Sequence, residues 1–241
     1  MLFRCTPWMR PLLLCLLLWP VLAFAQAADI DGAITAGIKA YQERRYQRAQ
    51  DSLASALKML QDKGIVDIRR ATALNALGMV CLARAKYNES ERYLLDALDL
   101  YKRLRGPQHP DVANCLINLG DLYYSANKPD VALECYTNAL QLQEALYSQQ
   151  SPELLVVLSN IAGLHSEMER SADAVPVLTR IIALIDQLKV DPGNLIWPLT
   201  ILAAAEKKLK HPAEQEKALA RVIPLAEKAW GNQHPDLLPL Y

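Results

Sequence analysis

Internal repetition is the feature that most constrains this chain. Residues 74–78, 116–120 and 158–162 carry the same pattern of apolar and small side chains, and each copy follows the last after 42 residues. A fixed period of about 20–50 residues is the signature of a repeat architecture. The chain is therefore predicted to be an array of similar units, each of which covers the apolar face of its neighbour.

Five units account for almost all of the sequence beyond residue 29. Steps of 41 residues extend the series of small residues to Gly37 and Ala203. Apolar side chains recur every three or four positions, as in amphipathic helices, and no useful length alternates as a strand does. We predict two helices in each unit. The expected units are residues 30–66, 67–109, 110–151, 152–192 and 193–234, and residues 235–241 begin a further helix.

Short motifs predict where helices begin. His109–Asp111 and His234–Asp236 place a capping His before Pro and an acidic residue, and Ser151–Glu153 does the same with Ser. A cap, a Pro at the first helical position and an acid near the positive end of the helix dipole all favour a helix start. Pro129 and Pro212 are expected to open second helices in the same way.

The repeated unit resembles the tetratricopeptide repeat. Gly78 and Gly120 stand where that family has a small residue, which lets two helices approach closely. The connector at residues 106–113, which recurs at 231–237, is similar to that of the 42-residue variety found in kinesin light chains. The resemblance covers about residues 30–241 and implies an all-α fold. That fold is a right-handed α-solenoid, or superhelix, of stacked antiparallel helix pairs.

Residues 1–25 have the pattern of a secretory signal peptide. Two arginines precede an apolar stretch at residues 12–24, and Ala23–Ala25 fits the A-x-A cleavage pattern. A membrane anchor is the alternative, but this run is short for a span and contains Pro20. We expect cleavage after the second of those alanines or two residues later. Residues 26–241 then form a periplasmic or secreted tetratricopeptide-repeat domain without a membrane span.

The composition and the motifs argue against several functions. The 26 basic and 26 acidic residues balance, whereas a nucleic-acid binder normally has an excess of Lys and Arg. No metal-ligand spacing, nucleophile motif or phosphate-binding loop occurs, so we expect no catalysis, no cofactor and no metal. Cys81, Cys115 and Cys135 are interpreted as small buried side chains. A single disulfide between two of them is the alternative.

The family resemblance implies a binding groove, because first helices line the concave surface of such arrays. Asn118 and Asn160 occupy equivalent positions. An amide both donates and accepts, so these two residues could pair with the backbone of an extended peptide, or they could bond between neighbouring helices. The expected groove is mostly uncharged, and an acidic residue of the guest would point toward Lys207. The candidate groove residues are Asn75, Asn114, Asn118, Tyr124, Ser159, Asn160 and Lys207.

The leading interpretation is a non-enzymatic exported scaffold that binds a protein or peptide partner. One alternative is the repeat segment of a larger exported protein whose activity lies beyond residue 241. Another is a self-assembling structural protein. Because residues 235–241 begin a helix without a polar cap, a homodimer through the C-terminal face is also expected as a possible assembly.

Overall fold

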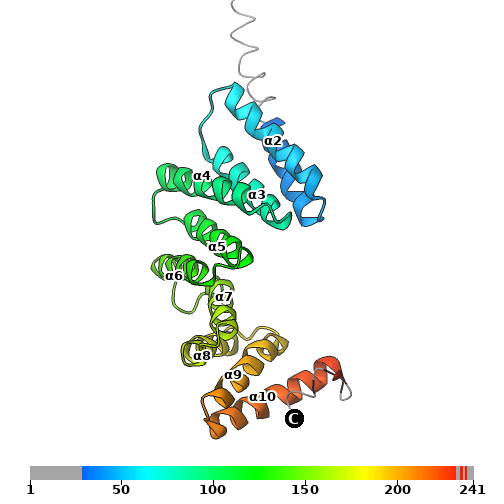
Figure 1. Ribbon diagram of the computed structural model, residues 1–241, viewed down its shortest axis with the longest axis vertical. Helices are drawn as coiled ribbons and strands as arrows, with labels where there is room; N and C mark the ends of the chain where they lie inside the picture. The colour runs from blue at the N-terminus through cyan, green and yellow to red at the C-terminus, as the bar shows by residue number, and fades with distance from the viewer. Residues whose placement is uncertain (1–28, 232–233, 236, 238–241) are drawn as a thin grey trace, which may run out of the picture. The chain divides into compact units, whose positions relative to one another are not determined.

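The structure is a computed structural model that describes residues 29–231, 234, 235 and 237. The regular secondary structure of these residues is helical throughout, and none of them is in a strand (Figure 1). The predicted all-α class is therefore confirmed. The predicted signal peptide and most of the predicted helix at residues 235–241 lie outside the described residues. No helix within the described part is long and apolar enough to cross a bilayer.

The chain divides into two compact units, with the division between Leu104 and Arg105. Helices follow one another in pairs within each unit (Figure 1). The first unit contains a helix at residues 29–42, α2 (Tyr46–Asp62), α3 (Ile68–Ala83) and α4 (Tyr87–Arg105). The second contains α5 (Pro110–Ser125), α6 (Pro129–Leu146), α7 (Leu154–Glu167), α8 (Ser171–Leu188), the 3-10 helix η1 (Pro192–Leu195), α9 (Ile196–Lys208) and α10 (Pro212–Trp230).

Close contacts at glycine hold the two helices of a pair together. In the first unit, a methyl group built on Gly78 of α3 would lie 2.6 Å from Cγ of Leu94 on α4. In the second unit, a methyl group on Gly120 of α5 would lie 2.3 Å from Cε1 of Tyr136 on α6. A side chain at either position would require its neighbour to move, so the predicted close approach at these two glycines is confirmed.

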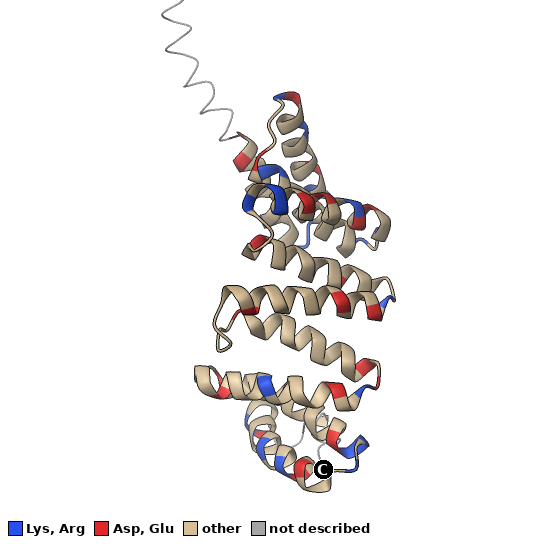
Figure 2. Ribbon diagram, turned by 90° about the vertical axis from the view of Figure 1, so that its left-hand side faces the viewer, with Lys and Arg blue, Asp and Glu red and all other residues tan. Residues whose placement is uncertain are grey.

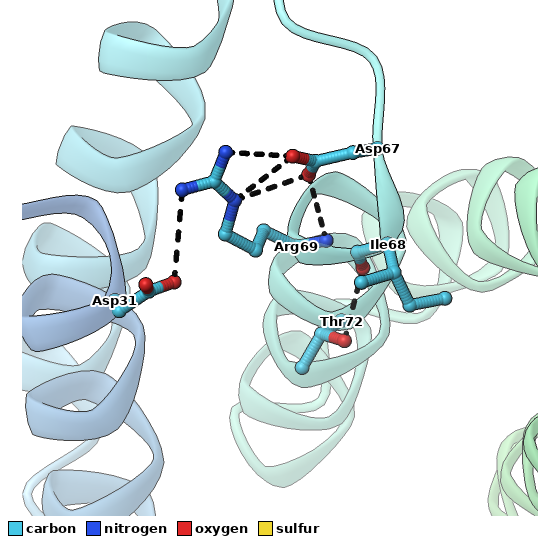
Figure 3. A network of polar contacts seen from close by, with 5 residues as sticks. All are labelled: Asp31, Asp67, Ile68, Arg69 and Thr72. Atoms are coloured by element: carbon cyan, nitrogen blue, oxygen red, sulfur yellow. Dashed lines mark hydrogen bonds and ion pairs between the residues drawn. The ribbon is translucent and has the colours of Figure 1, made fainter. Parts of the chain in front are cut away.

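A polar network fixes the start of α3 (Figure 3). The side chain of Asp67 accepts a hydrogen bond from the backbone N–H of Arg69 at 3.0 Å and thereby caps the helix. The Arg69 guanidinium donates back to Asp67 at 2.6 Å and lies 3.9 Å from the carboxylate of Asp31 on the preceding helix pair. This hydrogen-bonded guanidinium lowers the pKa of Asp67.

Of the predicted helix starts, those at residues 109–111, Pro129 and Pro212 are confirmed, and the one at residues 234–236 includes a residue outside the described part. His109 caps α5, where its Nδ1 accepts from the backbone N–H of Asp111 at 3.1 Å, and α6 and α10 each begin at a Pro. The predicted cap at Ser151 is wrong, because α7 begins at Leu154. The Ser151 hydroxyl hydrogen-bonds to the carboxylate of Glu153 instead of a backbone N–H, and Glu153 precedes the helix.

The three cysteines are free thiols, so none of them is in the disulfide that the sequence left open. Cys81 and Cys115 are buried, and Cys135 is half-buried. Burial raises the pKa of Cys135 to about 11. Since the thiolate is the reactive form, this side chain is unreactive near neutral pH.

Candidate functional site

A cleft of about 290 Å³ opens along the first helices of the second unit. We refer to it as the α5–α7 cleft. Most of its lining residues belong to α5 and α7, and Tyr136 is the lining residue from α6. Polar and charged side chains predominate, together with two tyrosines. The lining residues are Asp121, Tyr124, Ser125, Tyr136, Ser159, Asn160, Gly163, Leu164 and Glu167.

Three helices meet at the carboxylate of Asp121. Tyr136 of α6 is 3% exposed, and its hydroxyl donates a hydrogen bond to Oδ1 of Asp121 at 2.7 Å. Nδ2 of Asn160 on α7 donates to the same oxygen at 3.3 Å. Both donors are neutral, so Asp121 has hydrogen bonds from its neighbours without a compensating positive charge. Its second oxygen, Oδ2, receives neither of these two bonds.

Burial controls the ionisation of this pair. Desolvation raises the pKa of Asp121, and the hydrogen bond from Tyr136 partly opposes that effect because it favours the ionised carboxylate. Burial and the nearby carboxylate also raise the pKa of Tyr136 far above the ordinary value for a phenol. Tyr136 is therefore a hydrogen-bond donor over the whole range in which proteins are folded.

A second pair lies at the rim of the cleft. The hydroxyl of Tyr124 on α5 donates to Oε1 of Glu167 on α7 at 2.8 Å. Both side chains are exposed, and Tyr124 retains 45% of its surface. The carboxylate raises the pKa of Tyr124, which keeps that hydroxyl protonated. The rim therefore offers an aromatic surface beside a negative charge.

Three of the residues expected in the groove line this cleft, namely Tyr124, Ser159 and Asn160. The bond from Asn160 to Asp121 joins neighbouring helices, which is one of the two roles that the sequence left open for this asparagine. The same amide also faces the cleft. The cleft contains two carboxylates, so it differs from the mostly uncharged groove that the sequence suggested.

The other four candidates do not line the cleft. Asn114 is exposed on α5, and Lys207 is exposed on α9. Asn118 is half-buried on α5. Asn75 lies on α3 in the first unit. None of these four described side chains is among the lining residues, and their predicted role in binding stays a prediction.

Sequence reasoning placed Asp121 and Gly163 at inward positions of the first helices, but it assigned no role to them or to Tyr136. Tyr136 occupies the repeat position that Leu94 has in the previous pair, and it makes the same contact with a glycine. Asp121 and Gly163 both occupy the position of Met79. The signal was present in the sequence as departures from the repeat: a hydroxyl, a carboxylate and a missing side chain at positions that are apolar in the α3–α4 pair.

Comparison with known proteins agrees with this fold. Residues 69–144, which run from α3 into α6, match the tetratricopeptide repeat family. This stretch of the chain is thus similar to tetratricopeptide repeats. Within the described residues, no group of three His, Cys, Asp or Glu side chains could hold a metal ion. The helix-pair repeats thus provide hydrogen-bonding and charged groups on a rigid frame.

Relatives of known sequence and structure share the repeats. The chain is 25% identical over 135 residues to kinesin light chain-related protein 2 of Arabidopsis thaliana. The matched stretch is 56% of this chain and 20% of that protein. BtubC (BKLC) from P. vanneervenii has a TM-score of 0.72 at 18% identity over 88% of this chain and 91% of its own.

A Rap protein complexed with competence and sporulation factor has a TM-score of 0.61 at 15% identity, over 83% of this chain and 54% of that one. These likenesses confirm the solenoid of stacked antiparallel helix pairs and the resemblance to kinesin-light-chain repeats. The right hand of the superhelix stays a prediction.

Proposed function

We propose that this chain is a non-enzymatic scaffold that binds an extended segment of a partner protein in the α5–α7 cleft. Tetratricopeptide-type repeats are typical of protein-interaction modules, and a Rap protein of similar fold was solved as a complex with competence and sporulation factor. The observation that carries the proposal is the cleft itself, an open hollow on the first helices with an exposed aromatic rim.

The cleft has the groups that an extended segment requires. The amide of Asn160 and the hydroxyl of Ser159 lie on the same side, where they can pair with a peptide backbone. Tyr124 offers a rigid aromatic surface, a side-chain type that often dominates binding at interfaces. The hollow of about 290 Å³ suits a few side chains of a peptide rather than a whole domain.

We further propose that the scaffold works outside the cytoplasm, as the signal-peptide pattern of residues 1–25 suggests. Fractionation of cells that express the tagged chain checks this part independently of binding. The mature chain is expected in the periplasm or the medium, shortened by about 25 residues, the length of the pattern. A full-length product that stays in the cytoplasm would contradict it.

A blocking substitution tests the binding site. Gly163 leaves the middle of the cleft open, and the only side chain within 4 Å of a methyl group built there is that of Trp197, at 3.9 Å. Gly163→Met restores the residue type of Met79 and fills the cleft without disturbing the helix. Thr137→Met, on an exposed position of α6, adds a methionine outside the cleft as the matched control.

The measurement is affinity capture from an extract of the source organism with the wild type and both variants, each verified by circular dichroism. A partner retained by the wild type and by Thr137→Met, and lost with Gly163→Met, supports binding in the cleft. Equal capture by a correctly folded Gly163→Met variant rules the cleft out as the binding site.

A further inference from the structure

We propose that the segment bound in the α5–α7 cleft carries a basic side chain, arginine or lysine, that is held between the carboxylates of Asp121 and Glu167. This inference rests on the proposed function and names the chemistry of the partner. It differs from the sequence expectation of a weakly charged guest with an acid directed toward Lys207.

The charge distribution around the cleft is one-sided. The helices α5, α6 and α7 contain six carboxylates and no lysine or arginine. In Figure 2 these helices are accordingly tan and red. Lys128, in the turn between α5 and α6, is the only lysine or arginine in residues 106–169. Asp130 and Glu144 are neutralised by ion pairs with arginines outside these three helices, so the negative charge that favours a cationic partner is that of Asp121 and Glu167 in the cleft.

Basic side chains of the surrounding turns have other partners. Arg170 forms an ion pair with Asp130 at 2.9 Å, and Lys208 forms one with Glu169 at 3.2 Å. The ammonium of Lys128 lies over the ring of Tyr123, 5.8 Å from its centre. None of these three cations lines the cleft, so they leave its two carboxylates uncompensated.

The two carboxylates are arranged to accept further hydrogen bonds. Asp121 receives its bonds on Oδ1, from Tyr136 and Asn160, and Glu167 receives its bond on Oε1, from Tyr124. Those neutral donors fix the two groups and leave the second oxygen of each for a ligand. A guanidinium can donate from several N–H groups at once, which suits two carboxylates on opposite sides of a cleft. The burial that raises the pKa of Asp121 also strengthens its attraction to a cation, because less water screens it.

Two exposed aromatic side chains flank the carboxylates. Tyr124 is 45% exposed, and Trp197 of α9 is 42% exposed with Cζ2 beside Gly163. Large aromatic surfaces that remain in water are typical of binding sites. The aliphatic stem or the planar head of an arginine packs on such rings, and cations are attracted to their faces. A basic side chain thus satisfies both the charge and the aromatic character of the site.

The test is selection of peptides from a phage-displayed library of random dodecapeptides. The immobilised proteins are the wild type, the double variant Asp121→Asn with Glu167→Gln, and the blocked variant Gly163→Met. Each amide keeps the shape of the carboxylate and one acceptor oxygen, but it replaces the other oxygen with an NH2 donor and removes the charge. Glu167→Gln alone is included because Glu167 is exposed, so its replacement leaves folding intact even if the double variant is unstable.

The proposal predicts that arginine and lysine are enriched among peptides retained by the wild type and not among those retained by the double variant. A selected peptide, fluorescently labelled, should bind the double variant about tenfold more weakly and Glu167→Gln a few-fold more weakly. Rising salt should weaken its binding to the wild type more than to the double variant.

The other outcomes separate this inference from the proposed function. Retained peptides without basic enrichment, or with basic enrichment that persists on the double variant, overturn the inference while binding in the cleft stands. Enrichment of acidic residues also overturns it and favours the expectation that an acidic residue of the partner points toward Lys207. If the wild type retains no more peptide than Gly163→Met does, the cleft is not the binding site, and both proposals fail.

Discussion

The helix pairs α3–α4 and α5–α6 use the same contact for different purposes. In the first, Leu94 packs on Gly78 and the position of Met79 is apolar. In the second, Tyr136 packs on Gly120 in the same way, but its hydroxyl continues to Asp121 and the neighbouring surface is polar. The contact between α3 and α4 is apolar, whereas the tyrosine that makes the contact between α5 and α6 also lines the α5–α7 cleft.

The difference shows how a repeat can acquire a site without a change of fold. The glycine contact fixes the distance between the two helices, and it is insensitive to whether Leu or Tyr makes it. The proposed binding then depends on a few substitutions at positions where the frame tolerates them. The four predictions below test whether the frame is common to both pairs and whether the cleft is peculiar to the second, in order of decreasing effect.

The largest effect is expected at the shared contact. Gly78→Ala and Gly120→Ala each place a methyl group less than 3 Å from Leu94 or from Tyr136, so a side chain or a helix must move. Each variant should lower the free energy of unfolding by about 1–3 kcal/mol, more at Gly120 because a tyrosine ring adapts less easily than a leucine. Urea titration followed by circular dichroism measures both. An unchanged free energy of unfolding for either variant would mean that the two helix pairs do not share this glycine contact.

The next effect distinguishes the pairs. Tyr136→Phe keeps the contact with Gly120 but removes the hydroxyl that donates to the partly buried Asp121. The free energy of unfolding should fall by about 1–2 kcal/mol, because a partly buried acceptor loses the shorter of its two hydrogen bonds. Tyr124→Phe is the matched control: its hydroxyl bonds to an exposed carboxylate, so it should cost less than about 0.5 kcal/mol. Equal losses of unfolding free energy for Tyr136→Phe and Tyr124→Phe would mean that the buried and the exposed hydrogen bond do not differ.

A smaller effect, of opposite sign, is expected at the centre of the cleft. Gly163 is helical, and a methyl group there meets nothing nearer than the Trp197 ring at 3.9 Å. Gly163→Ala should therefore raise the free energy of unfolding by about 0.5–1 kcal/mol through helix propensity alone. The same urea titration measures it. A loss of stability would show that Gly163 is in a packed contact rather than beside an open cleft.

The two aspartates should respond to pH in opposite directions. The pKa of Asp67 is lowered, so its contribution to stability is present above the ordinary value of 3.8 and is lost as the pH falls through the folded value. The pKa of Asp121 is raised, so the folded state holds its proton longer than the unfolded state does. The contribution of Asp121 to stability therefore decreases as the pH rises from 3.8 toward the raised value.

Differences between the wild type and the variants Asp67→Asn and Asp121→Asn isolate these contributions. The advantage of the wild type over Asp67→Asn should grow as the pH rises, and its advantage over Asp121→Asn should shrink. Thermal midpoints over the acid range provide the measurement. Slopes of the same sign would mean that Asp121 is no more buried than Asp67.

The sequence predicted what depends on spacing. Helix pairs follow from apolar residues at three- and four-residue intervals, and the close contacts follow from the repeated Gly78 and Gly120. The cap at Ser151 was predicted wrongly because α7 begins three residues later, at Leu154, and the Ser151 hydroxyl donates to the carboxylate of Glu153. Local motifs do not show at which of several neighbouring residues the first helical turn closes.

The cleft was only partly predictable. Tyr124, Ser159 and Asn160 were found because inward positions on first helices recur with the period. The role of Asp121 depends on Tyr136, 15 residues later, and on Asn160, 39 residues later, so it appears only once three helices are packed together. Position-by-position comparison of the repeats would have flagged these residues as departures from the pattern, although not the bonds they make.

The central claim is that three departures from the repeat create the binding site. The variant that reverses them, Asp121→Met with Tyr136→Leu and Gly163→Met, restores the side chains of the α3–α4 pair in the same frame. Fluorescence anisotropy of a labelled, library-selected peptide compares it directly with the wild type. The account predicts a folded variant that binds at least about tenfold more weakly, a difference of about 1.4 kcal/mol. Undiminished binding by the folded variant would contradict it.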